Sequence, residues 1–491
     1  MTDFSSQTIL IVGLAREGQA AAQWLAARGA HIIASDLRPP AEDVREKMEA
    51  AGVRLMIGPQ TPDLLRHANV VVVSPGVPQE IPLLQGARAR NIPITTEPRL
   101  FAQGNPAPLV GVTGSSGKTT TATLVARMLE ASGFQTWLGG NIGSPLLPQI
   151  ANIRAQDRVV MELSSFQLIY WQSTAPWPQA PAPWNSGDAI SPQIAAILNL
   201  TPNHLDRHPS MAHYIAAKAN ILAAQKPGDA AILNRDDPLL AAWIRSGQVE
   251  IAAGPGQKAR SFPLAGRLIT FGFDKPQQGD GAWLSKGRIY LRHHGQTRLI
   301  TTTANVQLRG QHNLANVLAA VAIASAAGAS RTGLRDAIRS FRGVPHRLEE
   351  VLRTPDNIVW INDSIATAPE RAIAALRSYQ RPIILLAGGR DKDLPWQDWA
   401  QEAQKRARII IAFGEAAPII QRALQKHPAQ GQRPPLHQVK DLPQAVQLAH
   451  QLARTNDVVL LSPGGTSFDA YVDFAARGQH FRQLVKSIAT A

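Results

Sequence analysis

A glycine-rich segment at residues 111–121, GVTGSSGKTTT, constrains the fold of this chain more than any other feature. It follows the apolar run at residues 108–110 and leads into the helix-forming stretch TATLVARMLEA. A strand, a glycine-rich turn and a helix in this order aim backbone N–H groups at an anion bound to the helix N-terminus. The segment therefore predicts an α/β domain that binds a nucleoside triphosphate, with ATP as the expected ligand.

The segment departs from the usual phosphate-loop pattern G-x-x-x-x-G-K-[ST], because Val112 stands at the position of the leading glycine. Lys118 is expected to bridge the outer phosphates, and Thr119 is expected to offer its hydroxyl to Mg²⁺. The alternative is a glycine-rich turn that only caps an ordinary helix. The expected ATP-binding residues of this loop are Gly114, Ser115, Ser116, Gly117, Lys118, Thr119 and Thr120.

Length and composition limit the class of protein. A chain of 491 residues is expected to form about three domains. Its 44% hydrophobic and 18% charged residues are typical of globular proteins. The absence of cysteine excludes disulfides and thiolate chemistry. No apolar run is long enough to span a membrane and no signal peptide precedes the first one, so we expect a cytoplasmic protein, and we also expect a monomer.

The net charge of +14 raises the question of nucleic-acid binding. Lysine and arginine are scattered along the chain, and no dense basic block or basic stripe with interleaved aromatic residues occurs. Anionic small molecules such as nucleotides explain the charge equally well. We therefore expect no nucleic-acid partner.

The first expected domain, residues 1–104, opens with an apolar strand at 9–12, a loop with Gly13 and Gly18, and an alanine-rich helix. A second strand at 30–35 ends at Asp36, where a Rossmann-like domain places an acid against a ribose or base. Another strand, at 69–73, runs into the turn SPGVP, which exposes backbone N–H groups. The pattern predicts a Rossmann-like nucleotide-binding domain.

The second expected domain, residues 105–342, begins with the phosphate loop. Strands in RVVMELSSFQL and IAAILNL, a β-rich region near 247–303 and the helix GQHNLANVLAAVAIASAAG follow. Residues 172–191 are rich in proline, tryptophan and alanine without periodicity, so they are expected to form an inserted surface loop. The pattern predicts a P-loop ATPase-like domain with a parallel sheet.

The third expected domain, residues 343–491, alternates strands (NIVWIND, PIILLAGG, RIIIAFG, DVVLLSPGG) with helical stretches. This alternation predicts another parallel sheet, with ligand-facing loops at the carboxyl ends of its strands. The fold class is therefore α/β with three domains: a Rossmann-like N-terminal domain, a central P-loop ATPase-like domain and a C-terminal Rossmann-like domain.

Glu162 and His204 each follow a predicted strand. A carboxylate near a triphosphate loop is a typical Mg²⁺ ligand, whereas the alternative for Glu162 is an acid stabilised by a helix dipole. For His204, taken alone, capping of a turn is the better interpretation. A zinc site is not expected, because no thiolate or suitable carboxylate set accompanies His204, His208 and His213.

Lys218 falls on an otherwise apolar helix face with Met211, Tyr214, Ile221 and Leu222. From helix geometry alone, a lysine that extends to solvent is favoured. The alternative is a desolvated amine with a lowered pKa, which reacts with CO₂ to form a carbamate, an anionic metal ligand.

Arg347 and Asp363 flank the first strand of the third domain. An arginine in this place neutralises a transferring phosphoryl group, and an aspartate accepts a hydrogen bond from a nucleotide hydroxyl. The alternative is a surface ion pair that contributes little.

The ordered stretches VTGSSGKTTT, GGNIGSP, MELSSFQL, ILNLTPNHLDRH, YIAAKANIL, GQHNLANVLAA, GVPHRLEEV, NDSIAT, LAGGRDKD and LSPGGTSFD resemble the motifs of the Mur ligase family in all three segments. The resemblance implies an ATP-dependent, cytoplasmic step of peptidoglycan synthesis, the joining of D-glutamate to UDP-N-acetylmuramoyl-L-alanine. The substrate carboxylate takes the γ-phosphoryl group, and the amine of glutamate attacks the acyl phosphate. A cationic site is needed because anionic partners meet there.

The resemblance also implies roles for single residues. The implied catalytic residues are Lys118, His204, Lys218 and Arg347. The implied ligands of Mg²⁺, expected to be two ions, are Thr119, Glu162, His204 and Lys218. Lys218 matches the family's carbamylated lysine, which reverses the interpretation from helix geometry.

Substrate positions follow from the same motifs. Further ATP contacts are implied for Asn313, Asn316, Arg347 and Asp363. Contacts to the uridine nucleotide substrate are implied for Arg16, Glu17, Asp36, Arg38, Gly76 and Asn141. Glutamate contacts are implied for Thr367, Lys392, Ser467 and Phe474.

One departure concerns the amino-acid site. The best-known form of the family has NDSKAT, whereas Ile365 replaces the lysine here. The choice between D- and L-glutamate therefore stays open, with Lys392 or Arg390 as alternative cations. A folylpolyglutamate-synthase-like ligase is a rival, disfavoured by the SPGVP turn and the Rossmann-like first domain. A non-catalytic nucleotide-binding protein is a second rival, disfavoured by the combination of Lys118, Glu162 and Lys218.

Overall fold

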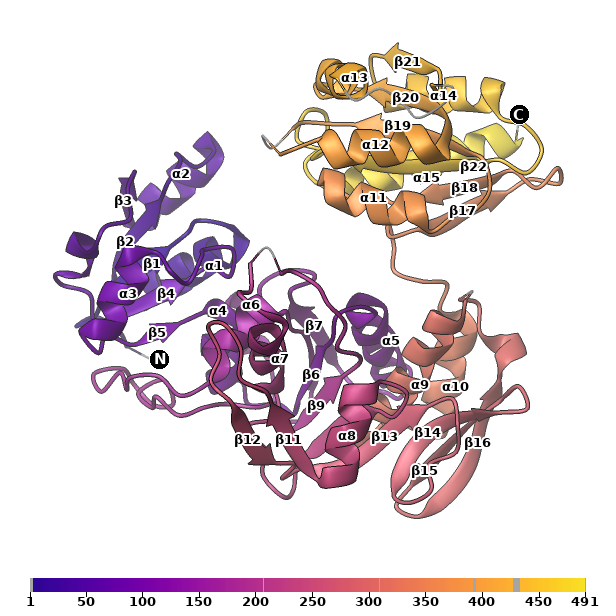
Figure 1. Ribbon diagram of the computed structural model, residues 1–491. Coiled ribbons are helices and arrows are strands. Elements are labelled where there is room, and N and C mark those ends of the chain that lie inside the picture. Colours follow the sequence, from indigo (N-terminus) through magenta and orange to yellow (C-terminus); the bar gives the residue numbers. More distant parts are fainter. Residues whose placement is uncertain (1–2, 206, 309, 392–393, 427–432, 491) are drawn as a thin grey trace. The chain divides into compact units, whose positions relative to one another are not determined.

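The computed structural model describes residues 3–205, 207–308, 310–391, 394–426 and 433–490. The chain divides into two compact units, Met1–Phe341 and Arg342–Ala491 (Figure 1). The first unit carries two large sheets and a small hairpin, and the second unit carries one sheet. Each unit is described by itself.

The first sheet has the strand order β3-β2-β1-β4-β5, and all its strands are parallel. Its order reverses between β1 and β4, the place where open α/β sheets bind ligands at the carboxyl ends of their strands. The strands are β1 (Thr8–Val12), β2 (His31–Asp36), β3 (Arg54–Ile57), β4 (Val70–Val73) and β5 (Ile94–Thr95). The helices are α1 (Arg16–Ala26), α2 (Glu42–Ala50), η1 (Pro62–Leu65), α3 (Pro82–Ala89) and α4 (Glu97–Gly104).

The glycine motif of this domain is incomplete, but it retains Gly18, at a position where the backbone of the preceding loop leaves no room for a side chain. A Cβ atom on Gly18 would lie 2.0 Å from the carbonyl oxygen of Gly13. Helix α1 therefore approaches the loop after β1 too closely for any side chain at this position. The predicted Rossmann-like start of the chain is confirmed by the parallel sheet and this turn.

The central sheet has nine strands in the order β16-β15-β14-β13-β10-β9-β6-β8-β7. It is parallel from β7 to β14, and β15 and β16 add antiparallel strands at one edge. Strand β6, which leads into the phosphate loop, lies inside the sheet and is buried along its whole length. The strands are β6 (Leu109–Thr113), β7 (Thr136–Gly140), β8 (Arg158–Glu162), β9 (Ile194–Ile197), β10 (Ala230–Asn234), β13 (Arg267–Gly272), β14 (Asp280–Ser285), β15 (Arg288–His293) and β16 (Gln296–Thr302).

Helices and short connections complete the central domain. Strands β11 (Gln248–Ile251) and β12 (Arg260–Pro263) form a separate antiparallel hairpin. Helix α9 is apolar around most of its circumference and packs against α5 as a buried helix. The helices are α5 (Lys118–Glu130), η2 (Leu147–Asn152), α6 (Ser165–Leu168), η3 (Ile169–Trp171), α7 (Met211–Ala219), α8 (Pro238–Ser246), η4 (Thr303–Asn305), α9 (Gln311–Ala326) and α10 (Arg331–Ser340).

Residues 172–191 contain no helix or strand and nine of them are exposed, as predicted for a surface loop, but three of them are buried. Trp177, Ala180 and Trp184 of this segment are buried. The indole ring of Trp177 packs against Phe4, and that of Trp184 packs against Phe4 and Trp24 of the N-terminal domain, so the buried side chains of this segment belong to a hydrophobic core.

The second unit is a six-stranded sheet in the order β17-β18-β22-β19-β20-β21, parallel except for β17. Adjacent residues Trp360 and Ile361 of β18 belong to separate apolar clusters, as alternation along a strand requires when helices cover both faces. The strands are β17 (Glu349–Arg353), β18 (Val359–Asn362), β19 (Ile383–Gly388), β20 (Ala407–Phe413), β21 (Leu436–Val439) and β22 (Val458–Gly464). The helices are α11 (Pro369–Arg377), α12 (Gln397–Arg406), α13 (Ala417–Lys426), α14 (Leu442–Leu452) and α15 (Phe474–Thr490).

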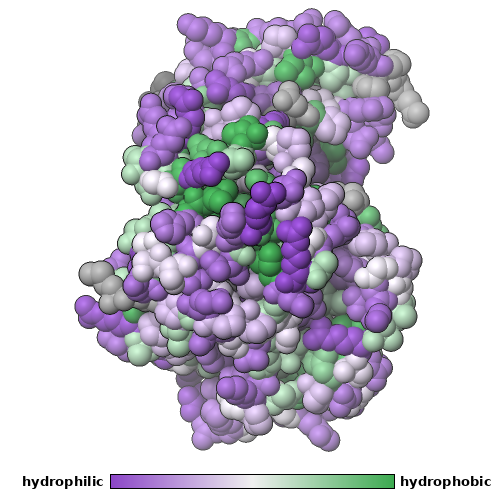
Figure 2. All heavy atoms as spheres, turned by 90° about the vertical axis from the view of Figure 1, so that its left-hand side faces the viewer, coloured by the Kyte–Doolittle hydropathy of each residue, from purple (hydrophilic) through white to green (hydrophobic). Residues whose placement is uncertain are grey.

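Hydrophilic side chains cover most of the face shown in Figure 2. Among the described residues, exposed large hydrophobic side chains include Leu37, Ile57, Phe468 and Val472. Within the part of the chain that the structure describes, every helix is too short or too polar to cross a bilayer.

Candidate active site

The phosphate loop connects the end of β6 with the start of α5 at Lys118. Gly117 has a φ of +81°, and a Cβ atom on it would lie 2.2 Å from Oδ1 of Asn316. Both the backbone conformation and the close approach of α9 therefore require glycine. The N–H groups of Ser115 and Ser116 donate to the carbonyl oxygen and Oδ1 of Asn199, each at 2.9 Å. The loop is thus held from the end of β9 as well as by its own helix.

Two lysines converge on this loop. Nζ of Lys118 and Nζ of Lys218 each donate to the carbonyl oxygen of Gly114 at 2.9 Å. Lys218 is only 2% exposed and also donates to Oγ1 of Thr113 at 3.2 Å. The interpretation from helix geometry alone, a lysine extending to solvent, is therefore wrong, because α7 packs its lysine under the loop.

The environment of Lys218 favours a neutral amine. Burial lowers the pKa of Lys218 well below its usual range, and the nearby charge of Lys118 lowers it further. The carboxylate of Glu162 acts in the opposite direction without reversing the shift. An unprotonated amine is the form that reacts with CO₂, so this position meets the chemical requirement for a carbamate.

Glu162 ends β8 and is 2% exposed. Its Oε1 accepts a hydrogen bond from Nδ2 of Asn141 at 2.8 Å, and the N–H of Asn141 donates to the Glu162 carbonyl at 2.8 Å. In the described part of the chain, Oε2 of Glu162 is buried and has no hydrogen-bond partner. A buried carboxylate oxygen without a partner is costly, so the site fits a cation. Mg²⁺ prefers one or two carboxylates together with phosphate oxygens.

Three histidines with different surroundings follow β9: His204 and His208 lie in the loop, and His213 lies in the first turn of α7. His204 is exposed with a φ of +55°, and its ring meets the edge of Phe166 at a centroid distance of 5.2 Å. His208 is buried and stacks on Phe166 with an interplanar angle of 11°. Its Nε2 hydrogen-bonds to Oγ of Ser165 at 2.9 Å, and its Nδ1 hydrogen-bonds to Nδ1 of His213 at 2.8 Å.

Burial lowers the pKa of His208 to about 4, and the neighbouring His213 lowers it as well. A neutral His208 therefore contacts Ser165 and Phe166 in α6, the helix that begins three residues after β8 ends at Glu162. The sequence interpretation weighed the three histidines only as a zinc set and missed this supporting role. The stacking of His208 on Phe166 joins two separate segments, so no residue spacing in the sequence predicts it.

The predicted residues of the N-terminal domain gather at the carboxyl edge of its sheet. Oδ2 of Asp36 accepts from the N–H of Leu14 at 2.8 Å, and Oδ1 accepts from the N–H of Arg38 at 3.2 Å. Asp36 thereby joins the loops that follow β1 and β2. The Gly76 carbonyl, in the loop after β4, accepts from Arg207 of the central domain at 3.0 Å.

A buried pair of acids lies where the N-terminal and central domains meet. Oε1 of Glu17 accepts from Nε2 of Gln167 at 2.7 Å, and Oε1 of Glu97 accepts from the N–H of Leu147 at 2.8 Å. Burial raises the pKa of Glu17 to about 7. Burial, reinforced by the charge of Glu17, raises the pKa of Glu97 to about 8.

We expect this pair to make the stability of the protein fall with pH. Both carboxyl groups have an ordinary pKa of 4.5, so above that pH the folded chain binds more protons than the unfolded chain. The free energy of unfolding therefore decreases between about pH 5 and about pH 8. Glu97→Gln keeps an acceptor for Leu147 and removes one titrating group, so it should flatten the decrease measured by thermal unfolding. Glu46→Gln, on exposed α2, is the control; an unchanged slope in Glu97→Gln would contradict the assignment.

In the second unit, Asp363 directly follows β18 and is buried. Its Oδ1 accepts from the N–H of Leu348 at 3.2 Å, and its Oδ2 accepts from Oγ of Ser462 at 2.9 Å. Burial raises the pKa of Asp363 to about 7. Asp363 is therefore buried and hydrogen-bonded to Leu348, just before β17, and to Ser462 of β22, unlike a residue of an exposed ion pair.

Of the predicted glutamate-binding residues, Thr367 lies in the loop after β18 and Ser467 in the loop after β22. Ser467 is buried, Thr367 is half-buried, and Phe474 begins α15 with its carbonyl accepting from Oγ of Ser364 at 2.8 Å. Lys392 lies outside the described residues. The N–H of Ile365 donates to the His346 carbonyl at 3.1 Å.

Arg477, which the sequence interpretation missed, holds these loops together. It is fully buried on α15, and burial lowers its pKa to about 10. Its guanidinium donates to Oγ and the carbonyl of Ser364 and to the carbonyls of Gly465 and Thr466, at 2.9–3.2 Å. A signal was present, because Arg477 shares a helix face with the buried Phe481 and Val485 at four-residue spacing.

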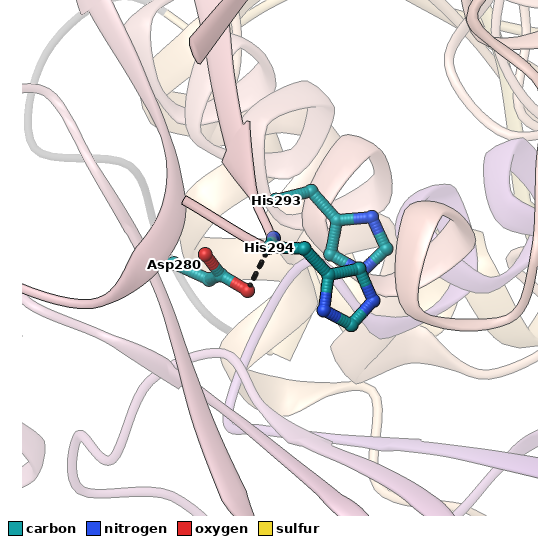
Figure 3. A group of neighbouring side chains, drawn as sticks. All are labelled: Asp280, His293 and His294. Carbon is teal, nitrogen blue, oxygen red and sulfur yellow. Dashed lines mark hydrogen bonds between the residues drawn. The ribbon is translucent and has the colours of Figure 1, made fainter. Parts of the chain in front are cut away.

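A third group of titratable side chains consists of Asp280 on β14, His293 at the end of β15 and His294 in the turn that follows (Figure 3). Figure 3 shows the carboxylate turned toward the backbone nitrogen of His294 and the two imidazoles side by side. Asp280 accepts from the N–H groups of His294 and Gly295 at 2.9 and 3.2 Å and pairs with Arg267 at 2.8 Å. His294 and Gly295 both have positive φ, as a two-residue hairpin turn requires. The carboxylate of Asp280 therefore stabilises the β15–β16 turn. Its charge is paired with the guanidinium of Arg267 in the place that a metal ion would take.

The fold and the loop define this chain as an α/β phosphate-loop protein with a further α/β domain on either side of the loop domain in sequence. It matches the family models "Mur ligase MurD-like, N-terminal domain" over residues 7–96, "Mur ligase middle domain" over 112–324 and "Mur ligase, glutamate ligase domain" over 346–465. The chain belongs to the Mur ligase family. The predicted resemblance and the three-domain α/β architecture are confirmed.

Similarity to curated relatives extends over the full chain. Three proteins named UDP-N-acetylmuramoylalanine–D-glutamate ligase illustrate it. The one from Pelotomaculum thermopropionicum is 36% identical over 490 residues, or 99% of both chains. The one from Symbiobacterium thermophilum is 37% identical over 483 residues, or 98% of both chains. The one from Roseiflexus sp. is 38% identical over 489 residues, or 98% of both chains.

Proposed function

We propose that this protein is a cytoplasmic ligase that uses ATP to join D-glutamate to UDP-N-acetylmuramoyl-L-alanine in peptidoglycan synthesis. The observation that carries the proposal is the phosphate loop together with Glu162 and Lys218. Glu162 has a buried carboxylate oxygen without a hydrogen-bond partner among the described residues, and the buried amine of Lys218 donates to the loop. The names of the full-length relatives support the substrates and favour D-glutamate over L-glutamate.

The reaction begins when a carboxylate oxygen of UDP-N-acetylmuramoyl-L-alanine attacks the γ-phosphorus of ATP. The bond to the β,γ-bridging oxygen breaks, which gives an acyl phosphate and ADP. The neutral amine of glutamate then attacks the acyl carbon, and inorganic phosphate leaves as the amide forms. Both steps bring anions together, so positioning and positive charge are the main contributions of the protein.

The chain provides a site for each contribution. The phosphate loop binds the triphosphate, with Lys118 on its outer phosphates and Thr119 and Glu162 as magnesium ligands. Mg²⁺, of which we propose two ions, neutralises phosphate charge when bound. We propose that Lys218 is a carbamate, which converts a buried amine into an anionic ligand, and that His204 completes the metal and substrate site. Arg347 neutralises charge on the transferring phosphoryl group.

Substrate contacts are proposed on the family motifs. The proposed uridine-nucleotide residues are Arg16, Glu17, Asp36, Arg38, Gly76 and Asn141. The proposed further ATP residues are Asn313, Asn316, Arg347 and Asp363. The proposed glutamate residues are Thr367, Lys392, Ser467 and Phe474. We also propose domain limits of 1–104, 105–342 and 343–491 and a monomeric enzyme.

We expect phosphate release from ATP only when UDP-N-acetylmuramoyl-L-alanine and glutamate are both present. The first substrate is needed to form the acyl phosphate, and glutamate is needed to release inorganic phosphate from it. The assay compares D-glutamate, L-glutamate and a mixture lacking the amino acid, with the amide product identified by mass spectrometry. Release with L-glutamate alone would overturn the stereochemical part of the proposal. No release with either enantiomer would refute the ligase.

A further inference from the structure

Residues 172–191, called the strap below, leave η3 and return to the start of β9 as a closed loop. The N–H of Thr174 donates to the Gly187 carbonyl at 2.8 Å, and the N–H of Trp177 donates to the Asn185 carbonyl at 3.2 Å. The two ends of the strap therefore lie side by side, as in compact loops that pack on their own side chains. A long irregular loop in a compact domain usually has a functional role.

Arg99, on helix α4, fastens the base of the strap. This arginine is 1% exposed, and its guanidinium donates to the carbonyls of Tyr170, Gln172 and Asp188. Burial lowers the pKa of Arg99 to about 10, with the charge of Asp188 acting in the opposite direction. Because α4 lies between the first sheet and the phosphate-loop domain, Arg99 ties the strap to the segment that joins the two domains.

The tip of the strap packs on the N-terminal domain. Trp177 stacks at a tilt on Phe4 at a centroid distance of 5.5 Å, and its Nε1 donates to Oε1 of Gln7 at 2.9 Å. Trp184 packs on Trp24 of α1 at 5.6 Å, and its Nε1 donates to the Leu100 carbonyl at 2.8 Å. Buried aromatic pairs that also satisfy their polar atoms make specific, rigid contacts.

Other hydrogen bonds also link the two domains. Those of Glu17 with Gln167 and of Glu97 with Leu147 are buried, whereas two others near the nucleotide loops are exposed. Arg16 donates to the Gly143 carbonyl at 2.6 Å, and Arg207 donates to the Gly76 carbonyl at 3.0 Å. Both are exposed hydrogen bonds, which contribute little to a fixed orientation. The strap adds buried aromatic contacts and their hydrogen bonds to these links, at a place away from the two exposed hydrogen bonds.

We propose that the strap is a positioning element that fixes the N-terminal domain against the phosphate-loop domain. The inference rests on the proposed function, in which one domain holds the uridine nucleotide and the other holds ATP. The substrate must reach from the first site to the γ-phosphate, and a misplacement of about 1 Å can reduce the rate about 100-fold. A fixed orientation removes that misplacement before substrate binds.

The orientation is tested without any substrate. The chain has no cysteine, so spin labels on Glu46→Cys of α2 and Arg245→Cys of α8 report one distance between the two domains. In the strap-shortened variant, residues 175–186 are replaced by two glycines between Thr174 and Gly187, which keeps all acceptors of Arg99. We expect a narrow distance distribution in the full chain and a broad one in the shortened variant. Equal widths would overturn the proposal.

Kinetics separate positioning from a loss of stability. Trp184→Ala should raise the KM for UDP-N-acetylmuramoyl-L-alanine about 10-fold with little change in the KM for ATP. Trp243→Ala is the matched control, because this buried indole on α8 donates to the Glu250 carbonyl at 3.0 Å and lies in the phosphate-loop domain. Trp184→Phe, which keeps the ring contact, should restore most of the affinity.

The outcomes are distinguishable. Equal KM changes in Trp184→Ala and Trp243→Ala would show that the strap only stabilises the fold and would overturn the proposal. If the ligase reaction itself is absent, the full chain releases no phosphate, whereas the distance measurement still decides the role of the strap.

Discussion

A Glu162→Gln variant is expected to lose about 1000-fold in kcat/KM and to unfold at a higher temperature than the unmodified protein. The two changes have one cause. A metal ion held by this carboxylate would contribute several kcal/mol of charge stabilisation in the reaction, and about 1.4 kcal/mol corresponds to tenfold in rate. Without the metal, the same buried carboxylate oxygen has no partner among the described residues, so removing its charge stabilises the fold.

Glutamine is a close substitute in shape. Its carbonyl oxygen can still accept from Nδ2 of Asn141, so the contact at Oε1 is retained. Steady-state kinetics over a series of Mg²⁺ concentrations and thermal unfolding check the two parts separately. Glu130→Gln is the control, because Glu130 is exposed at the last position of α5, in an ion pair with Arg127 that contributes little. Retained activity in Glu162→Gln would show that the carboxylate only anchors Asn141.

The alternation of strand-like and helix-like segments in the sequence predicted most of the fold. Apolar runs such as Val70–Val73 are buried along their whole length, as parallel strands covered on both faces must be. The strands β17 and β21 were not predicted, because each is short, at a sheet edge and only partly buried. An edge strand needs no continuous apolar run, so it leaves a weak periodic signal.

The residues of the candidate site also fall into those that the sequence predicted and those that it did not. Residues in loop motifs, such as Lys118 and Glu162, lie where their position after a strand predicts, because parallel strands end at one edge of the sheet. Residues that support these loops from other segments were missed. His208 and Arg477 act through ring stacking and hydrogen bonds to backbone carbonyls that only the folded chain brings together.

The strap shows the limit of composition as a guide. Proline, alanine and the absence of periodicity predict an irregular loop, and the segment is irregular. Its tryptophans, however, are buried against a domain that begins about 170 residues earlier in the chain, as the hydrogen bond between Trp177 and Gln7 shows with its separation of 170 residues. A local sequence pattern does not predict a contact between residues so far apart in the chain. The presence of tryptophans in an irregular segment does indicate that part of it is buried.

A Lys218→Ala variant is expected to lose about 1000-fold in kcat and to regain part of that loss when formate or acetate is added. The expectation follows from burial. An amine held under the phosphate loop with a lowered pKa is neutral and reacts with CO₂, and the resulting carbamate is an anion. Alanine leaves a cavity in which a short carboxylate can take the place of that anion.

The alternative role for Lys218 gives different results. If its amine only holds the loop through Thr113 and Gly114, a carboxylate cannot replace a donor, and Lys218→Ala stays inactive at every acetate concentration. In that case, labelling the protein of natural sequence with ¹³CO₂ gives no carbamate resonance. Lys226→Ala, an exposed lysine just beyond α7, is the control and should keep full activity with no response to acetate. Rescue in Lys218→Ala together with a carbamate resonance that Lys218→Ala lacks identifies Lys218 as the modified residue, since an anion is restored where an amine was removed.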